Sequence, residues 1–340
     1  MPESAGCLYG PQAGKRKQKT LTRLERIILR WPPIAFLLKK SKSWVIPGFR
    51  GIPVYDVVNF FLKQVKRVGL DERAAAISFN LIMALPAAIL FLFSLIPLFP
   101  KPESFKREIL SLFKDITPNS STYVFIENIL NDLLDNHHIG IFSFGFLLLI
   151  FYSSNAMIGI IRTFDKSIQE NKKIFLHQRW RAIRLTVILI VLILISAFAL
   201  FLGKQQLTYV LKNFFSMRRA ERLSWWNGLR WGIITGLLFY GIAFIYKFAP
   251  NIKKRWSLVS PGSLLATGLT MATTLLFSYW VNNFASYNKI YGSIGTVLII
   301  MILIYINSLI LLIGFELNVS ITYLTKEVEE RKEKERLEKA

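Results

Sequence analysis

Six long apolar runs dominate this chain and constrain what it can fold into. They are Phe79–Phe99, Ile139–Ile161, Leu185–Gly203, Trp231–Phe248, Leu258–Val281 and Ser293–Phe315. Each run has about twenty residues, enough for a helix to cross a hydrocarbon layer of about 30 Å. A water-soluble helix of this length would carry one polar face, and these runs show almost none. The pattern predicts an all-α polytopic membrane protein with six transmembrane helices.

The distribution of charge orients these runs. A net charge of +22 in a soluble protein would suggest a nucleic-acid partner. Here the two termini and alternate gaps hold 30 Lys and Arg, whereas the remaining gaps hold 10. Because cytoplasmic loops are enriched in basic residues, both termini are predicted to be cytoplasmic and no nucleic-acid partner is expected. The gap 204–228, with 5 basic residues, fits this orientation least well.

The chain is expected to have three parts. Residues 1–53 form a basic, partly disordered cytoplasmic region, residues 54–323 the membrane domain, and residues 324–340 a charged cytoplasmic tail. Within the membrane domain, residues 54–70 place apolar side chains at helical spacing, with basic residues between them. This helix either lies on the anionic inner leaflet or packs beneath the bundle. Residues 103–136 predict an amphipathic helical hairpin on the outer side, which either seals the helix ends or serves as a gate or partner surface.

Polar side chains inside the runs are the first functional candidates, because a polar group in hydrocarbon is costly without a partner. The candidates for a polar path are Asn155, Arg162, Thr270, Asn307 and Glu316. For Thr270 and its neighbours the alternative is a hydroxyl bonded to the carbonyl four residues earlier. Glu316 is expected to act either in a structural ion pair, with Arg73 or Arg162, or as a coupling carboxylate. Arg162 can also pair with Asp165, three residues further along the same helix face.

Three glycines at intervals of four residues open the fourth run. Gly228, Gly232 and Gly236 would form a smooth ridge on a helix, which allows a second helix to approach closely. They are therefore predicted to be helix-packing positions.

Sequence patterns that support catalysis are missing. The chain has three histidines and one cysteine, without the spacing of a zinc site, and it has no Gly-rich phosphate-binding loop. No metal, no cofactor and no enzymatic activity are predicted.

Several motifs follow one another in a family-specific order. They are Arg73–Phe79, Ile161–Asp165, Tyr246–Pro250, Pro261-Gly262, Tyr291–Gly295 and Gly314-x-Glu316-x-Asn318. Over about residues 55–323 this order resembles the YihY/BrkB family of bacterial inner-membrane proteins. Only Ala84–Ala87 departs from it, where the family usually shows a bulkier aromatic-proline pair. The resemblance implies six helices with both termini inside and a multi-pass protein of the inner membrane. Some members have been called ribonuclease BN, and others have been linked to envelope lipid traffic.

Together these features predict a transporter-like protein that moves a lipid or another amphiphilic envelope component. The alternatives are a non-transporting membrane scaffold and, least favoured because no metal-ligand set is present, a tRNA-processing ribonuclease. The expected partners are membrane lipids of the anionic inner leaflet, together with a second copy of the chain or an envelope protein.

Overall fold

The computed structural model describes most of the membrane domain. The described residues are 42, 44–46, 48–49, 51–94, 110, 124, 127–128, 131, 139–168, 175–213, 219–252, 255–283 and 287–339. Their main helices are α3 (Val54–Val68), α4 (Leu70–Ser94), α7 (Ile139–Ser167), α8 (Phe175–Asn213), α9 (Arg219–Phe248), α10 (Pro261–Asn283) and α11 (Tyr287–Lys339). No strand occurs in these ranges. Residues 1–41 and nearly all of the expected hairpin at 103–136 lie outside them.

Five of these helices are long and apolar enough to cross a membrane. The qualifying segments are Leu70–Ile89, Phe144–Ser167, His177–Ala197, Gly228–Phe248 and Val297–Glu338. They correspond to five of the six apolar runs. The remaining run, Leu258–Val281, corresponds to the 23-residue helix α10, which is not among the five. The count of six spans and the cytoplasmic placement of both termini stay predictions.

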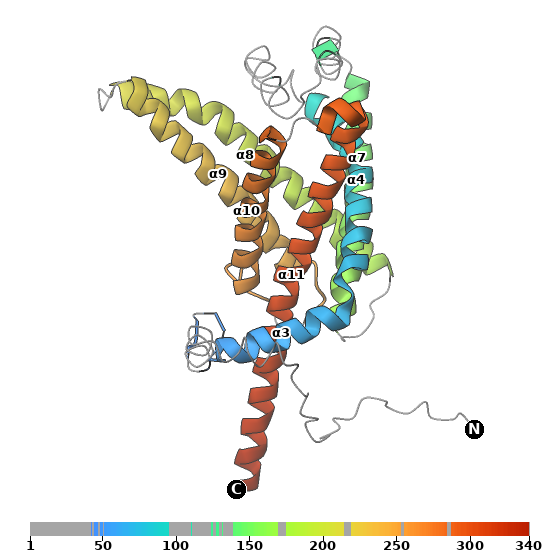
Figure 1. Ribbon diagram of the computed structural model, residues 1–340, viewed down its shortest axis with the longest axis vertical. Coiled ribbons are helices and arrows are strands. Elements are labelled where there is room, and N and C mark those ends of the chain that lie inside the picture. The colour runs from blue at the N-terminus through green and yellow to red at the C-terminus, as the bar shows by residue number, and fades with distance from the viewer. Residues whose placement is uncertain are drawn as a thin grey trace, which may run out of the picture.

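The first span begins earlier than its apolar run indicates. Gly69 ends α3 in the left-handed region, with φ 65°, and α4 starts at the next residue, Leu70. A glycine tolerates this conformation without a Cβ clash and allows the chain to turn sharply. As a result α3 lies across one end of the bundle, here called the α3 end, while α4 rises into it (Figure 1). Pro86 lies inside α4 without ending the helix.

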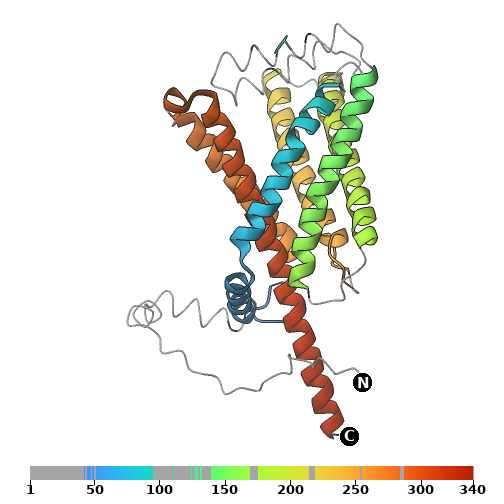
Figure 2. The same ribbon diagram turned by 90° about the vertical axis from the view of Figure 1, so that its right-hand side faces the viewer.

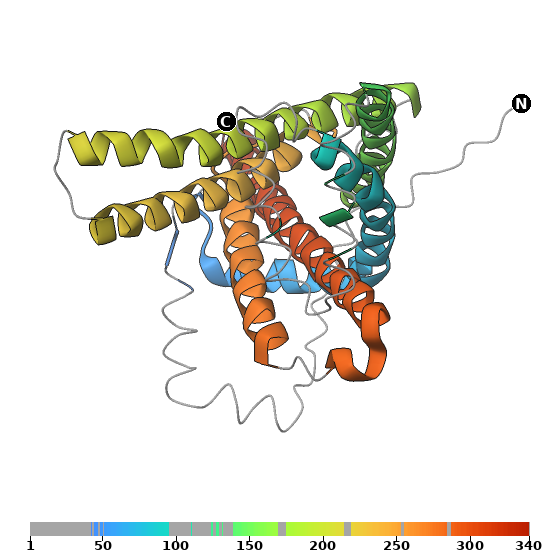
Figure 3. The same cartoon turned by 90° about the horizontal axis from the view of Figure 1, so that it is seen from above.

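The helices lie close together near the α3 end and spread apart with distance from it. The long helix α11 runs beside α10, crosses α4 and α7, and continues past α3 (Figure 1). Away from α3, the α10–α11 pair separates from α4, α7 and α8 (Figure 2). Seen from above, α8 and α9 run side by side and extend away from the other helices (Figure 3).

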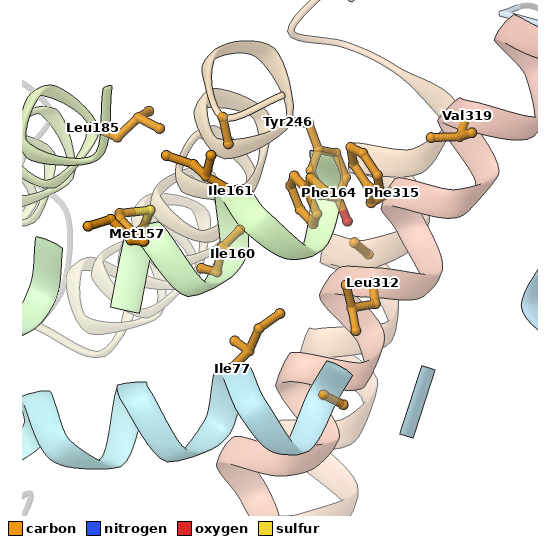
Figure 4. Close-up of a cluster of buried hydrophobic side chains, with 14 of the residues drawn as sticks. Ile77, Met157, Ile160, Ile161, Phe164, Leu185, Tyr246, Leu312, Phe315 and Val319 are labelled. Atoms are coloured by element: carbon orange, nitrogen blue, oxygen red, sulfur yellow. The ribbon is translucent and has the colours of Figure 1, made fainter. Parts of the chain in front are cut away.

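An aromatic cluster fills the region of convergence (Figure 4). The rings of Phe164 on α7 and Phe315 on α11 stack with centroids 3.6 Å apart, and both residues are fully buried. Tyr246 on α9 packs against both rings, and its hydroxyl donates to the Leu311 carbonyl at 2.6 Å. Trp256 covers the other side, 5.4 Å from the Phe315 ring. Stacked aromatic pairs bury large apolar areas, so this cluster holds α7, α9 and α11 together.

The amphipathic helix α3 packs beneath the bundle. Val57 is fully buried against α11, in a cluster that includes Leu317 and Ile321. This face of α3 therefore packs against the bundle, and the interfacial placement of residues 54–70 stays a prediction. Val58 and Leu62 remain exposed, so contact of the rest of α3 with the inner leaflet stays a proposal.

Candidate functional site

A buried carboxylate links three helices at the α3 end. Arg73 of α4 places Nη1 3.5 Å from Glu316 Oε1 of α11 and donates to Ser167 Oγ of α7 at 2.7 Å. Ser167 Oγ in turn donates to Glu316 Oε1. The Glu316 side chain is fully buried and that of Arg73 is 13% exposed. The structure thus brings together Arg73 and Glu316, one of the pairs considered from sequence, and adds Ser167, which sequence reasoning missed.

The second oxygen of this carboxylate is less well satisfied. Glu316 Oε2 is buried and has no hydrogen bond of normal geometry with any described residue, although Gln64 of α3 interacts with the same carboxyl group. An unsatisfied buried oxygen costs free energy. Glu316 therefore depends strongly on the partners of Oε1.

Asp165 forms a second link, between α7, α8 and the segment after α9. Its Oδ2 lies 3.4 Å from Arg181 Nη2, and its Oδ1 accepts the Asn251 backbone N–H at 3.2 Å. Arg181 also donates to the Ala249 carbonyl at 3.0 Å. Arg181 lies 16 residues from Asp165 in the sequence. The pairing of Asp165 with Arg162 was predicted from a spacing of three residues, which could not indicate so distant a partner. Arg162 itself is exposed on α7.

Glycine and asparagine join α10 to α11. The Gly262 backbone N–H donates to Asn318 Oδ1 at 2.9 Å, and Asn318 Nδ2 donates to Ser260 Oγ at 3.0 Å. Gly262 and Gly314 face each other so closely that a Cβ on either would overlap backbone of the other. At this crossing α10 and α11 approach each other through glycine backbone on both sides.

The other expected polar-path residues make separate contacts. Asn155 of α7 accepts a hydrogen bond from Arg179 of α8. On α10, the backbone carbonyl of Thr270 accepts the Thr274 hydroxyl at 2.8 Å, which is the alternative expected for these threonines.

Asn307 of α11 donates to the carbonyl of Leu303, four residues earlier, while its buried Oδ1 finds no partner among the described residues. None of the five candidates, Asn155, Arg162, Thr270, Asn307 and Glu316, lines the cavity between α4, α7 and α8 or the groove on α8 that are described below. The structure does not assemble them into one path.

The glycine ridge on α9 is not used for packing within the described structure. A Cβ added at Gly228, Gly232 or Gly236 would have no atom within 4 Å. No described helix packs on these three residues, and their helix-packing role stays a prediction. The physical reason is that α9 meets α8 and α10 through other faces.

The open space beside this ridge can be tested with Gly232→Ala. The substitution is expected to leave the free energy of unfolding unchanged or to raise it by up to about 1 kcal/mol, because alanine favours a helix and meets open space. The measurement is thermal unfolding of the purified protein in detergent. A drop in stability would show that the ridge packs against another surface, for example a second copy.

An apolar cavity lies between α4, α7 and α8. Its volume is about 260 Å³, and its lining residues are Leu81, Ala84, Ala88, Phe91, Leu149, Ser153, Ala156, Met157, Thr186, Leu189, Ile190, Ile193 and Leu194. Only Ser153 and Thr186 contribute hydroxyls. Thr186 Oγ1 is buried and has no hydrogen-bond partner among the described residues. About 10–15 Å³ of such volume holds one water molecule, so the cavity has room for several.

Sequence reasoning missed this cavity. The only local signal is the spacing of Ala84 and Ala88, one helical turn apart on α4, together with Ala156 on α7. Small side chains on facing helices leave space that larger ones would fill.

Metal ligands do not gather in the part of the chain that the structure describes. No group of three or more His, Cys, Asp or Glu residues there could hold a metal ion.

Comparison with known proteins identifies relatives of unequal coverage. The "Putative ribonuclease-like protein YfkH" of Bacillus subtilis is 28% identical over 264 residues, which cover 76% of this chain and 94% of that protein. A "UPF0761 membrane protein" of Tolumonas auensis is 23% identical over 267 residues, which cover 76% of this chain and 82% of that protein. The "UPF0761 membrane protein PSHAa0171" of Pseudoalteromonas translucida matches a shorter stretch. It is 32% identical over 96 residues, which cover 27% of this chain and 32% of that protein. No solved structure matches the chain.

The family model described as "Virulence factor BrkB" matches residues 61–339. This match confirms the resemblance carried by the motif order, and with the five apolar helices it makes the chain a multi-pass membrane protein. Because the model spans most of the sequence, the chain belongs to the BrkB family.

Proposed function

We propose that this chain is a transporter-like protein of the bacterial inner membrane that accommodates the apolar part of a lipid or another amphiphile in the cavity between α4, α7 and α8. The observation that carries the proposal is the cavity itself, about 260 Å³ in volume. Its walls offer two hydroxyls and are otherwise apolar. An apolar lining favours a hydrocarbon chain over an ion or a sugar, since those would lose their hydration without compensation.

The contacts at the α3 end support a moving-helix mechanism. Glu316 interacts with Gln64 of α3, and the neighbouring Leu317 packs in one cluster with Val57 of α3, so the link to Arg73 lies at that end. Away from it the helix pairs diverge (Figure 2). Helix bundles that alternate access rock as rigid bodies about a fixed region. In this proposal the linked end is the fixed region and the divergent ends open the cavity.

Orientation follows from charge. Basic residues concentrate in the termini and in alternate gaps, and this bias favours a cytoplasmic α3 end. The exposed basic residues of α3 and of the α11 extension then face the cytoplasm.

Lipid movement by purified protein tests the proposal. Wild-type protein in liposomes is expected to move a fluorescent phospholipid between leaflets faster than protein-free liposomes. Ala88→Phe, which fills the cavity, is expected to lower this rate at least about tenfold, because an added ring occupies the space that the chain needs. The readout is the time course of chemical quenching of the label in the outer leaflet.

The matched control is Ala272→Phe, an exposed position on α10. It adds the same ring to the outside of the bundle and is expected to keep the wild-type rate. Equal rates in wild-type and protein-free liposomes would contradict transport. That outcome would favour the non-transporting scaffold.

A further inference from the structure

A second hollow lies on a different face of α8. This groove has a volume of about 560 Å³ and begins among basic side chains in the first turns of the helix. His177, Arg181 and Arg184 contribute the basic part, and Trp180 stands beside them with 70% of its surface exposed. Beyond Arg184 the lining is aliphatic, with Val187 and Ile188, and Ile183 lies between Arg181 and Arg184. A basic end that leads into an aliphatic end matches the shape of an amphiphile.

The positive charge in this groove is not neutralised by the helix itself. The 39 residues of α8 contain no Asp or Glu. Asp165 engages Arg181 at 3.4 Å, which fixes that guanidinium at the groove wall. Arg184 is exposed and makes no ion pair with any residue that the structure describes.

The groove also begins where the apolar part of α8 begins. The segment of α8 that is long and apolar enough to cross a membrane starts at His177, which would place the basic side chains at the level of lipid headgroups. Tryptophan is enriched at this interface, where its ring is half in the apolar layer and its N–H remains polar, and Trp180 occupies such a position. Basic pockets at the cytoplasmic ends of membrane helices are typical sites for anionic headgroups.

We propose that this groove binds one anionic phospholipid, with the phosphate between Arg184 and His177 and an acyl chain along Val187 and Ile183. Snorkelling of arginines to the interface would account for the basic end alone. It would not account for the hollow of about 560 Å³ in which the basic and the aliphatic side chains meet. The inference is independent of the cavity between α4, α7 and α8, which is lined by other residues of the helix, such as Thr186 and Leu189.

Lipid retention measured by native mass spectrometry tests this inference. The full-length protein is reconstituted in nanodiscs that contain phosphatidylglycerol and phosphatidylcholine in equal amounts, and the lipids that stay bound after release are identified. The wild-type protein is expected to retain one phosphatidylglycerol molecule in preference to phosphatidylcholine. Arg184→Gln is expected to lower that retention about fivefold, the effect of one interfacial arginine on an anionic lipid.

Two further variants separate this site from general charge attraction. Val187→Trp fills the aliphatic end and keeps every basic residue, and it is expected to lower retention as Arg184→Gln does. Arg255→Gln removes an exposed arginine outside the groove and is expected to retain lipid as the wild type does. Thermal unfolding checks that the variants are folded, which is expected because Val187 and Arg184 are exposed.

Three results would overturn the inference. The first is equal retention of the two lipids, and the second is an equal loss of phosphatidylglycerol in Arg255→Gln and Arg184→Gln. The third is displacement of the bound lipid by inorganic phosphate at millimolar concentration, which would identify a plain anion site. Each of these results leaves the liposome assay of Ala88→Phe unaffected.

Discussion

Replacing Gly262 with alanine is expected to lower the free energy of unfolding by at least about 3 kcal/mol, because the new methyl group meets backbone. A Cβ at this position would overlap the Gly314 carbonyl oxygen and lie 2.7 Å from the Asn318 side chain. A backbone carbonyl cannot move away by changing rotamer, so α10 and α11 would have to separate. Separation would also break the hydrogen bond from the Gly262 N–H to Asn318, 2.9 Å long. The measurement is unfolding of the purified protein in mixed micelles with increasing denaturing detergent.

The matched control lies on the same helix. Gly268 of α10 has nothing within 4 Å of an added Cβ. Gly268→Ala is expected to change stability by no more than about 1 kcal/mol, and in the stabilising direction. If Gly262→Ala and Gly268→Ala unfold alike, the close crossing of α10 and α11 is contradicted.

Helix positions could be predicted from the sequence because the membrane leaves few alternatives. A backbone in hydrocarbon must satisfy its own hydrogen bonds, so an apolar run of sufficient length becomes a helix. The start of the first membrane helix is nevertheless predicted too late. The apolar run begins at Phe79, whereas α4 begins at Leu70. The helical turns between Leu70 and Phe79 contain Arg73, and a charged residue does not fit an apolar run. Its partner Glu316, 243 residues away, makes that charge tolerable inside the bundle.

Packing positions could not be predicted in the same way. Local spacing shows that Gly228, Gly232 and Gly236 share one face of a helix, but it does not show which helix, if any, lies opposite. The close contact is made instead by Gly262 and Gly314, single glycines on two different helices. Their importance depends on where α10 crosses α11, and that is a property of the whole fold.

The polar residues show a similar limit. A polar group in a membrane helix can be satisfied by its own helix, as the Asn307 side chain partly is through the Leu303 carbonyl. Its presence therefore does not establish a path. A cavity is equally invisible in sequence, because the space beside Thr186 exists only when three helices meet around it.

Replacing Glu316 with glutamine is expected to lower the free energy of unfolding by about 3 kcal/mol, because removal of one partner leaves a charge buried without compensation. Glutamine keeps the shape of the side chain but removes the charge that faces Arg73, which is only 13% exposed. Glu329→Gln, on the exposed extension of α11, is the control and is expected to change stability by less than about 0.5 kcal/mol. Unfolding in mixed micelles gives both values.

The double variant Arg73→Gln with Glu316→Gln distinguishes the two roles considered for this carboxylate. If Glu316 is the structural partner of Arg73, removing both charges is expected to cost less than the sum of the two single substitutions, because neither variant group is then a buried lone charge. If Glu316 instead couples an ion to transport, Glu316→Gln would unfold like the wild type and lose only lipid movement in liposomes. Additive losses of stability would contradict the ion pair. The contact of Glu316 with both Arg73 and Ser167 favours the structural role, since a carboxylate oxygen that receives two donors is already committed to holding α4 and α7 against α11.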